Sequence, residues 1–192
     1  MKAPMVARRF LRVCATLLLG LAFLTGTGLA ASASSDPQPS FVVRTVTYDA
    51  SGAAEFRAAV DEGAQIWNQH VRNVQFVPGT PADVVIYADN GWPRAMPTGL
   101  GSGYVWMGRQ AVQQGHYPVR IAAHELGHIL GLPDRRTGLC SDLMSGASAG
   151  TSCRNPDPSP AEAAEVEYNF QNGRTALVPG VTLADSPART RH

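Results

Sequence analysis

The residues with the clearest chemical potential are two histidines and a glutamate on one predicted helix. His124 and His128 are four residues apart, and a helix turns through about 400° over that distance, so both imidazoles share one face. Two imidazoles placed one turn apart can bind the same zinc ion. Glu125 is rotated by about 100° from His124 and would face a metal-bound water instead of the ion. The spacing predicts a catalytic zinc site with Glu125 as general base.

A catalytic zinc site needs a third protein ligand. Gly131 can end the helix, Pro133 restricts the chain that follows, and Asp134 then lies six residues past His128. Its carboxylate completes the predicted ligand set. The other histidines of the chain are His70, His116 and His192. Only His116, which lies just before the helix, competes for the third position.

An ordinary helix with two unrelated histidines is the alternative interpretation. The residues around the histidines are apolar enough to bury the helix: Ile121, Ala122, Leu126, Ile129 and Leu130. Burying Glu125 between two histidines without a metal or polar partners would be costly. We therefore favour the metal site.

Residues 1–33 have the anatomy of a secretory signal peptide. A basic start with four Lys and Arg residues precedes an apolar run from Val13 to about Leu24, and Ala31-Ser32-Ala33 offers a cleavage site. The run is short for a membrane span of roughly 20 residues. The remaining chain has 12 arginines, 15 acidic residues and a net charge of −3. We expect a secreted protein that binds neither nucleic acid nor, after signal removal, a membrane.

Cysteine usage agrees with export. Cys14 lies within the signal peptide, which leaves Cys140 and Cys153 with 12 residues between them. An even pair in an oxidising compartment favours a disulfide. Two free thiols are the alternative.

Residue patterns predict several strands and helices around this site. Strands are expected at 41–48, 74–77, 83–88 and 104–107. Helices are expected from a Ser51 cap to about residue 71, at 118–130, and from a Ser159 cap to Gly173. Residues 89–103 hold four glycines and two prolines and are expected to be an exposed loop. This order suggests a layered domain with a helix behind a twisted sheet.

The last helix has the most specific start signal. Ser159 as N-cap, Pro160 at the first helical position and Glu162 two residues later predict a capping box. Residues 34–44 before the domain are polar at first and form a candidate short pro-segment. Residues 174–192 form a tail with little pattern.

The string from His124 to Asp134 is similar to the metzincin signature with its third histidine replaced by aspartate. That replacement resembles the snapalysin family of small secreted neutral metalloproteases. Leu143-Met144-Ser145-Gly146 resembles the metzincin Met-turn, although Met144 alone would equally suit a core methionine. Cys140 and Cys153 flank it as the family's disulfide pair does. The resemblance covers residues 45–173.

This resemblance implies a fold, an activity and a cofactor. The fold would be α+β and metzincin-like, with a twisted four- or five-stranded mixed sheet, an active-site helix and a C-terminal helix. Residues 104–107 would be the edge strand that pairs with substrate. The activity would be zinc-dependent endopeptidase cleavage of proteins or peptides by a monomer with one zinc ion. A preference for an aromatic residue after the cut is also implied.

Two positions depart from the family pattern. Arg136 stands where the family has a tyrosine that helps hold the oxyanion, so Arg136 is a candidate oxyanion donor, and a solvent-facing role is the alternative. Tyr117 and Val119 stand at family calcium positions, so calcium is not expected. A non-catalytic zinc protein and another zinc amidase are the competing functions. Glu125 argues against a purely structural zinc site, which has no use for a base.

Overall fold

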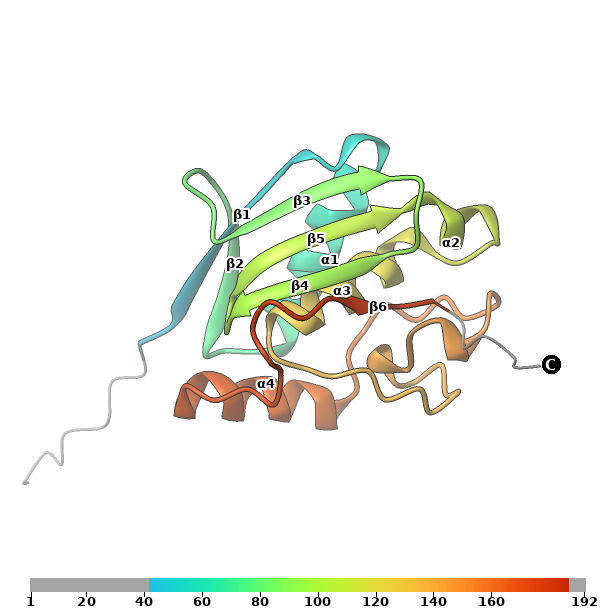
Figure 1. Ribbon diagram of the computed structural model, residues 1–192. Coiled ribbons are helices and arrows are strands. Elements are labelled where there is room, and N and C mark those ends of the chain that lie inside the picture. Colours follow the sequence, from blue (N-terminus) through green and yellow to red (C-terminus); the bar gives the residue numbers. More distant parts are fainter. Residues whose placement is uncertain (1–41, 187–192) are drawn as a thin grey trace, which may run out of the picture. The chain divides into compact units, whose positions relative to one another are not determined.

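The computed structural model describes residues 42–186 (Figure 1). The predicted signal peptide and most of the candidate pro-segment lie outside these residues. The strands are β1 (Arg44–Gly52), β2 (Val74–Pro78), β3 (Val84–Asp89), β4 (Arg94–Gly99), β5 (Ser102–Gly108) and β6 (Leu183–Ala184). The helices are α1 (Arg57–His70), α2 (Arg109–Gln113), α3 (Pro118–Ile129) and α4 (Pro160–Asn172), with short 3₁₀ segments η1 (Ala54–Phe56) and η2 (Leu143–Ala149).

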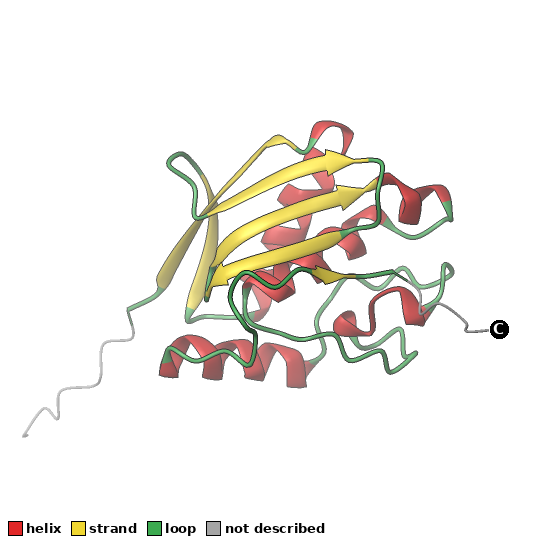
Figure 2. Cartoon of the chain, viewed as in Figure 1, coloured by secondary structure: helices red, strands yellow, loops and turns green. Residues whose placement is uncertain are grey.

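The described strands form one mixed sheet in the order β2-β1-β3-β5-β4-β6 (Figure 2). Neighbours from β2 to β5 run parallel, whereas β4 is antiparallel to both β5 and β6. β3 lies inside the sheet, which suits its nearly continuous apolar sequence. The α+β class is confirmed. The sheet has six strands instead of the expected four or five, because residues 89–103 contribute β4 and the tail contributes β6.

Two predictions about the strands near β4 and β5 were wrong. Residues 89–103 contain strand β4, in which Ala95 and Pro97 are buried, instead of an exposed loop. Prolines and glycines suggested a loop, but Pro97 lies next to an irregularity in the β4–β5 register, where a strand tolerates a missing N–H. Consequently Tyr104–Met107 is not an edge strand, since β5 lies between β3 and β4.

Helices α1 and α3 pack together against one face of the sheet (Figure 1). Trp67 of α1 is fully buried and donates a hydrogen bond from Nε1 to the carbonyl of Ala123 in α3, at 2.8 Å. Gly63 permits this close approach, because a Cβ there would lie 2.9 Å from the Ala123 nitrogen. The α1 start was predicted wrongly: Ser51 belongs to β1, and the helix begins at Arg57 without a side-chain cap.

Helix α4 begins and ends as predicted. The Ser159 side chain accepts from the Glu162 nitrogen, the Glu162 carboxylate accepts from the Ser159 nitrogen, and Pro160 is the first helical residue. Gly173 ends the helix in the left-handed conformation, with φ 61°. Within residues 42–186, every helix is too short or too polar to cross a membrane.

Candidate metal centre

Helix α3 carries the histidine pair through the middle of the domain. Its residues from Val119 to Ile129 are all buried, which explains the nearly continuous apolar sequence around the histidines. Gly131 has φ +93° and reverses the chain after the helix, with the Leu132 nitrogen donating to the Gly127 carbonyl at 3.0 Å. This turn returns Asp134 to the face of α3 that holds both histidines.

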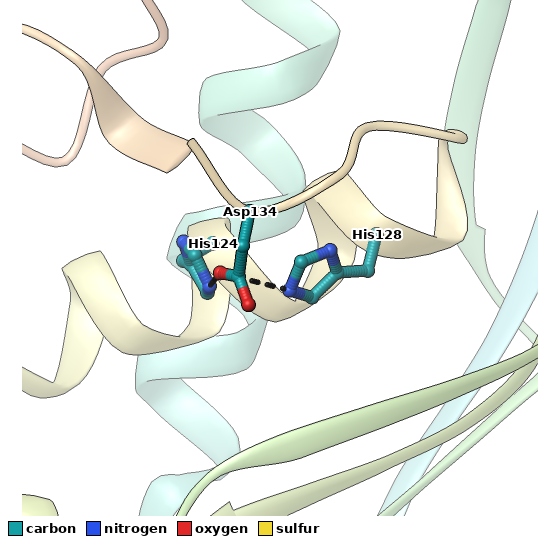
Figure 3. A group of neighbouring side chains, drawn as sticks. All are labelled: His124, His128 and Asp134. Carbon is teal, nitrogen blue, oxygen red and sulfur yellow. Dashed lines mark ion pairs between the residues drawn. The ribbon is translucent and has the colours of Figure 1, made fainter. Parts of the chain in front are cut away.

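The three predicted ligands meet at one point (Figure 3). Asp134 Oδ1 lies 3.3 Å from His124 Nε2 and 3.7 Å from His128 Nε2. Ligands about 2.0–2.2 Å from a tetrahedral zinc ion are separated from one another by roughly 3.3–3.6 Å. The spacing of these atoms therefore suits a four-coordinate zinc ion.

Both imidazoles are oriented by backbone carbonyls. His124 Nδ1 lies 3.1 Å from the Leu143 carbonyl, and His128 Nδ1 lies 2.7 Å from the Leu132 carbonyl. Because a carbonyl only accepts, each Nδ1 carries a proton, so it is Nε2 of each imidazole that faces the centre and can bind a metal ion in the neutral form of the ring. Carbonyl partners of this kind are usual for metal-binding histidines.

The centre holds polar atoms that nothing in the described chain satisfies. Within residues 42–186, the buried side-chain atoms without a hydrogen-bond partner are His124 Nε2, His128 Nε2, Asp134 Oδ1 and both carboxylate oxygens of Glu125. Such groups are costly to bury unless a partner binds them. All of them belong to the predicted ligand set and its general base, so the residues fit a bound metal ion.

The electrostatics of the centre also favour a cation. Burial raises the pKa of Glu125 well above its ordinary value, and the carboxylates of Asp185 and Asp134 raise it further. Burial alone would lower the pKa of His124, but Asp185 and Asp134 outweigh it and raise that pKa to about 9. Burial lowers the pKa of His128 to about 3, and the neighbouring His124 adds to this effect. The carboxylates thus stabilise positive charge at this point.

Met144 lies directly beneath α3. It is fully buried in η2, and a Cβ on Gly127 would lie 2.7 Å from its sulfur. Gly127 lies between the two histidines in the sequence, so the methionine supports the helix at the site. This is the position that the Met-turn resemblance implied.

Two buried charged residues hold the segment that contains Met144, and the sequence did not reveal this role for either. Glu162 accepts from the Leu143 and Met144 nitrogens, at 3.0 and 2.7 Å, in addition to capping α4. Arg120 donates to the carbonyls of Asn155 and Asp142, at 2.5 and 2.7 Å.

Two sequence features could have pointed to these roles: the capping box that contains Glu162, and the position of Arg120 on its helix. Arg120 lies four residues before His124 in an apolar helix and so shares its face. A disulfide joins Cys140 and Cys153, with 5.5 Å between their Cα atoms, and closes the same segment. The predicted pairing is therefore present.

Of the other residues considered for the site, some contact the predicted ligands and others only lie nearby. Arg136 contacts one of the predicted ligands, with Nη2 donating to Asp134 Oδ2 at 3.1 Å. His116 lies beside the centre, packed edge-on against Trp92, but it belongs to neither group of potential ligands found in the described residues. Asp185, from the tail, was missed entirely: it is buried, and its Oδ1 lies 4.0 Å from His124 Nε2.

His70 and His192 do not join the centre in the described chain. His70 Nδ1 lies 2.8 Å from the Ile66 carbonyl at the end of α1, and His192 lies outside the described residues. The sequence had no signal for Asp185, because nothing near residue 185 shows that the chain returns to the histidines.

Comparison with known proteins agrees with this site. Residues 43–173 match the family described as Streptomyces extracellular neutral proteinase (M7). The chain is 45% identical over 131 residues to the extracellular small neutral protease of Streptomyces caespitosus, covering 67% of this chain and 98% of that protein. It is 41% identical over 138 residues to the same-named protein of Streptomyces coelicolor, covering 70% and 63% respectively.

These relatives are named as extracellular proteases, which agrees with the expected export of this chain. The matched residues include α3, the turn to Asp134, η2 and α4. The family implies a metal, and the structure brings a suitable set of ligands together. The chain therefore belongs to the Streptomyces extracellular neutral proteinase family, as its resemblance to snapalysins indicated, and is a metalloendopeptidase acting on proteins or peptides.

Proposed function

We propose that the protein is a secreted zinc endopeptidase in which His124, His128 and Asp134 hold one zinc ion. The observation that carries this proposal is the convergence of buried, unpartnered donor atoms on one point. Two neutral imidazoles and one carboxylate form a donor set typical of catalytic zinc, with a position left open. A zinc ion held there would lower the pKa of a coordinated water to about 7 and polarise the scissile carbonyl.

Glu125 is proposed as the general base. Its carboxylate is fully buried beside His124, and neither oxygen has a hydrogen-bond partner in residues 42–186. A zinc ion bound beside it would oppose the effect of burial on its pKa, and the ionised carboxylate could then accept a proton from the attacking water and pass it to the leaving amine. Arg136 is proposed as the oxyanion donor, because its guanidinium remains charged and lies over Asp134.

The substrate is proposed to bind as an extended strand along β4. The edge of β4 that faces away from β5 pairs only with the two-residue β6 in this structure, and a peptide that took the place of β6 could form main-chain hydrogen bonds there. A pocket next to His124 includes His116, Tyr117 and Ile121 in its lining. These rings and the aliphatic side chain support a preference for an aromatic residue after the cleaved bond.

The test is a casein digestion with the secreted, mature protein. We expect about one zinc per chain by elemental analysis, loss of cleavage after treatment with a chelator, and recovery when zinc is restored. A non-catalytic zinc protein would bind zinc without cutting casein. An amidase specific for other substrates would leave casein intact but release amine from a small amide. Either of these results would exclude the proposal.

A further inference from the structure

The C-terminal segment, residues 174–186, follows α4 and passes alongside the candidate metal centre. It lies beyond residues 43–173, the part of the chain that matches the family. After Gly173 ends the helix, the Thr175 hydroxyl lies 3.4 Å from the carbonyl of Gly131. The C-terminal segment therefore begins against the turn that brings Asp134 to the histidines.

The C-terminal segment continues as a strand along β4. The Gly180 nitrogen donates to the Pro97 carbonyl at 2.7 Å, and the Asp185 nitrogen donates to the Pro93 carbonyl at 3.0 Å. Between these points β6 pairs antiparallel with β4, as the dark red arrow beside the sheet shows (Figure 1). An extended peptide bound to a sheet edge makes the same main-chain hydrogen bonds. The C-terminal segment thus occupies the edge proposed for the substrate.

Asp185, near the end of the C-terminal segment, lies beside the candidate metal centre. It is 4% exposed, and its Oδ1 lies 4.0 Å from His124 Nε2 while accepting from the Ala147 nitrogen at 2.9 Å. His124, Glu125 and Asp185 each offer a ligand atom within 4.8 Å of the others. This second group shares His124 with the predicted ligand set, so the Asp185 carboxylate lies next to the proposed metal position on the His124 side.

The surroundings are shaped to admit this carboxylate. A Cβ on Gly146 would lie 2.2 Å from Asp185 Oδ1 and 3.1 Å from His124 Cε1. The backbone at Gly146 has φ 56°, which L side chains rarely adopt. Only glycine at this position leaves room for the Asp185 side chain against the histidine.

Arg136 links the C-terminal segment to the ligand set. Its Nη2 donates both to Asp134 Oδ2, at 3.1 Å, and to the Ala184 carbonyl, at 3.0 Å. Its Nη1 lies 3.6 Å from Asp185 Oδ1. The arginine that departs from the family's tyrosine therefore holds the C-terminal segment, which itself lies outside the family match.

We infer that the C-terminal segment is an intramolecular inhibitor of the protease, with β6 filling the substrate edge and Asp185 supplying a carboxylate to the open position of the metal. This inference rests on the proposed function, because it requires a metal held by His124, His128 and Asp134. Substrate and C-terminal segment compete for one edge, so the apparent affinity for substrate falls with the fraction of molecules in which the segment is displaced.

The experiment compares cobalt-substituted wild-type protein with Asp185→Asn and with Asp157→Asn, an exposed control. Asparagine retains an oxygen for the Ala147 nitrogen, so the variant keeps this hydrogen bond but removes the charge, and thereby weakens the hold of the segment on the centre. We expect Asp185→Asn to change the visible absorption of cobalt and to bind acetohydroxamate at least about tenfold more tightly, with a similar rise in kcat/KM on casein. The control variant should match the wild type in all three measurements.

A measurement on the wild-type protein is independent of any variant. The amides of Gly180 and Asp185 donate to Pro97 in β4 and to Pro93 just before it, so they should exchange slowly with deuterium, and acetohydroxamate should accelerate that exchange by displacing the segment. An Asp185→Asn variant with the wild-type cobalt spectrum and a hydroxamate affinity within about twofold of wild type would overturn the inference. Failure of the proposed function looks different: no variant would bind cobalt at one ion per chain, and casein cleavage would not respond to a chelator.

Discussion

Glu162→Ala is expected to destabilise the protein more than any other single change in α4. The carboxylate is 2% exposed and accepts four hydrogen bonds, from the nitrogens of Leu143 and Met144 and from both the nitrogen and the hydroxyl of Ser159. Leaving two buried backbone donors unsatisfied costs about 1–3 kcal/mol each. Losing half of the capping box adds about 1 kcal/mol. The sum is about 3–7 kcal/mol, out of a typical total stability of about 5–15 kcal/mol.

Guanidinium unfolding of the metal-saturated protein measures this loss. Glu165→Ala is the matched control, because Glu165 lies in the same helix but pairs with Arg135 at the surface, where an ion pair contributes about 0–1 kcal/mol. Ser159→Ala removes only the hydroxyl and should cost about 1 kcal/mol. Glu162→Gln keeps one acceptor oxygen and should fall between these two variants and Glu162→Ala. A Glu162→Ala protein within about 1 kcal/mol of Glu165→Ala would refute the assigned role.

Three further predictions concern the chemistry of the centre. Glu125→Gln should keep zinc at one ion per chain yet lose nearly all casein cleavage, because Glu125 is proposed as base and not as ligand; substantial residual turnover would contradict this. Asp134→Ala should lose zinc on dialysis, whereas His116→Ala should keep it, and equal loss by metal analysis would show the ligand set to be wrong. Arg136→Ala, compared with Asp185→Asn in a background that already carries Asp185→Asn and so holds the C-terminal segment more weakly, should lower kcat by about a hundredfold at unchanged zinc content, the usual effect of losing an oxyanion donor. An unchanged kcat would show that Arg136 holds the C-terminal segment and does not stabilise the oxyanion.

The site was largely predictable from the sequence, because its main residues are close together in the chain. Helix periodicity places His124 and His128 on one face without tertiary information, and a glycine at residue 131 predicts where the helix ends. The return of Asp134 follows from that turn. Glu162 was identified as a cap for the same reason: its partner Ser159 is three residues away.

Residues that reach the site from a distance could not be predicted. Asp185 meets His124 only because β6 pairs with β4, and this pairing depends on a strand that the glycines and prolines of residues 89–103 concealed. Burial overrode the local signal at Ala95, which lies in the core, since tertiary packing decides strand formation more than composition does. The misplacement of the edge strand followed directly from that error.

A single carbonyl joins the metal centre to the segment beneath it. The Leu143 oxygen lies 3.1 Å from His124 Nδ1 and also accepts from Arg120 Nη2, at 3.3 Å. Metal binding and the folded position of residues 140–153 are therefore thermodynamically linked. A ligand present at 100 times its dissociation constant adds about 2.7 kcal/mol to the stability of the state it binds. We therefore expect loss of the metal to loosen this segment, so that the metal concentration around the proposed exported protease would influence how long it survives digestion by its neighbours.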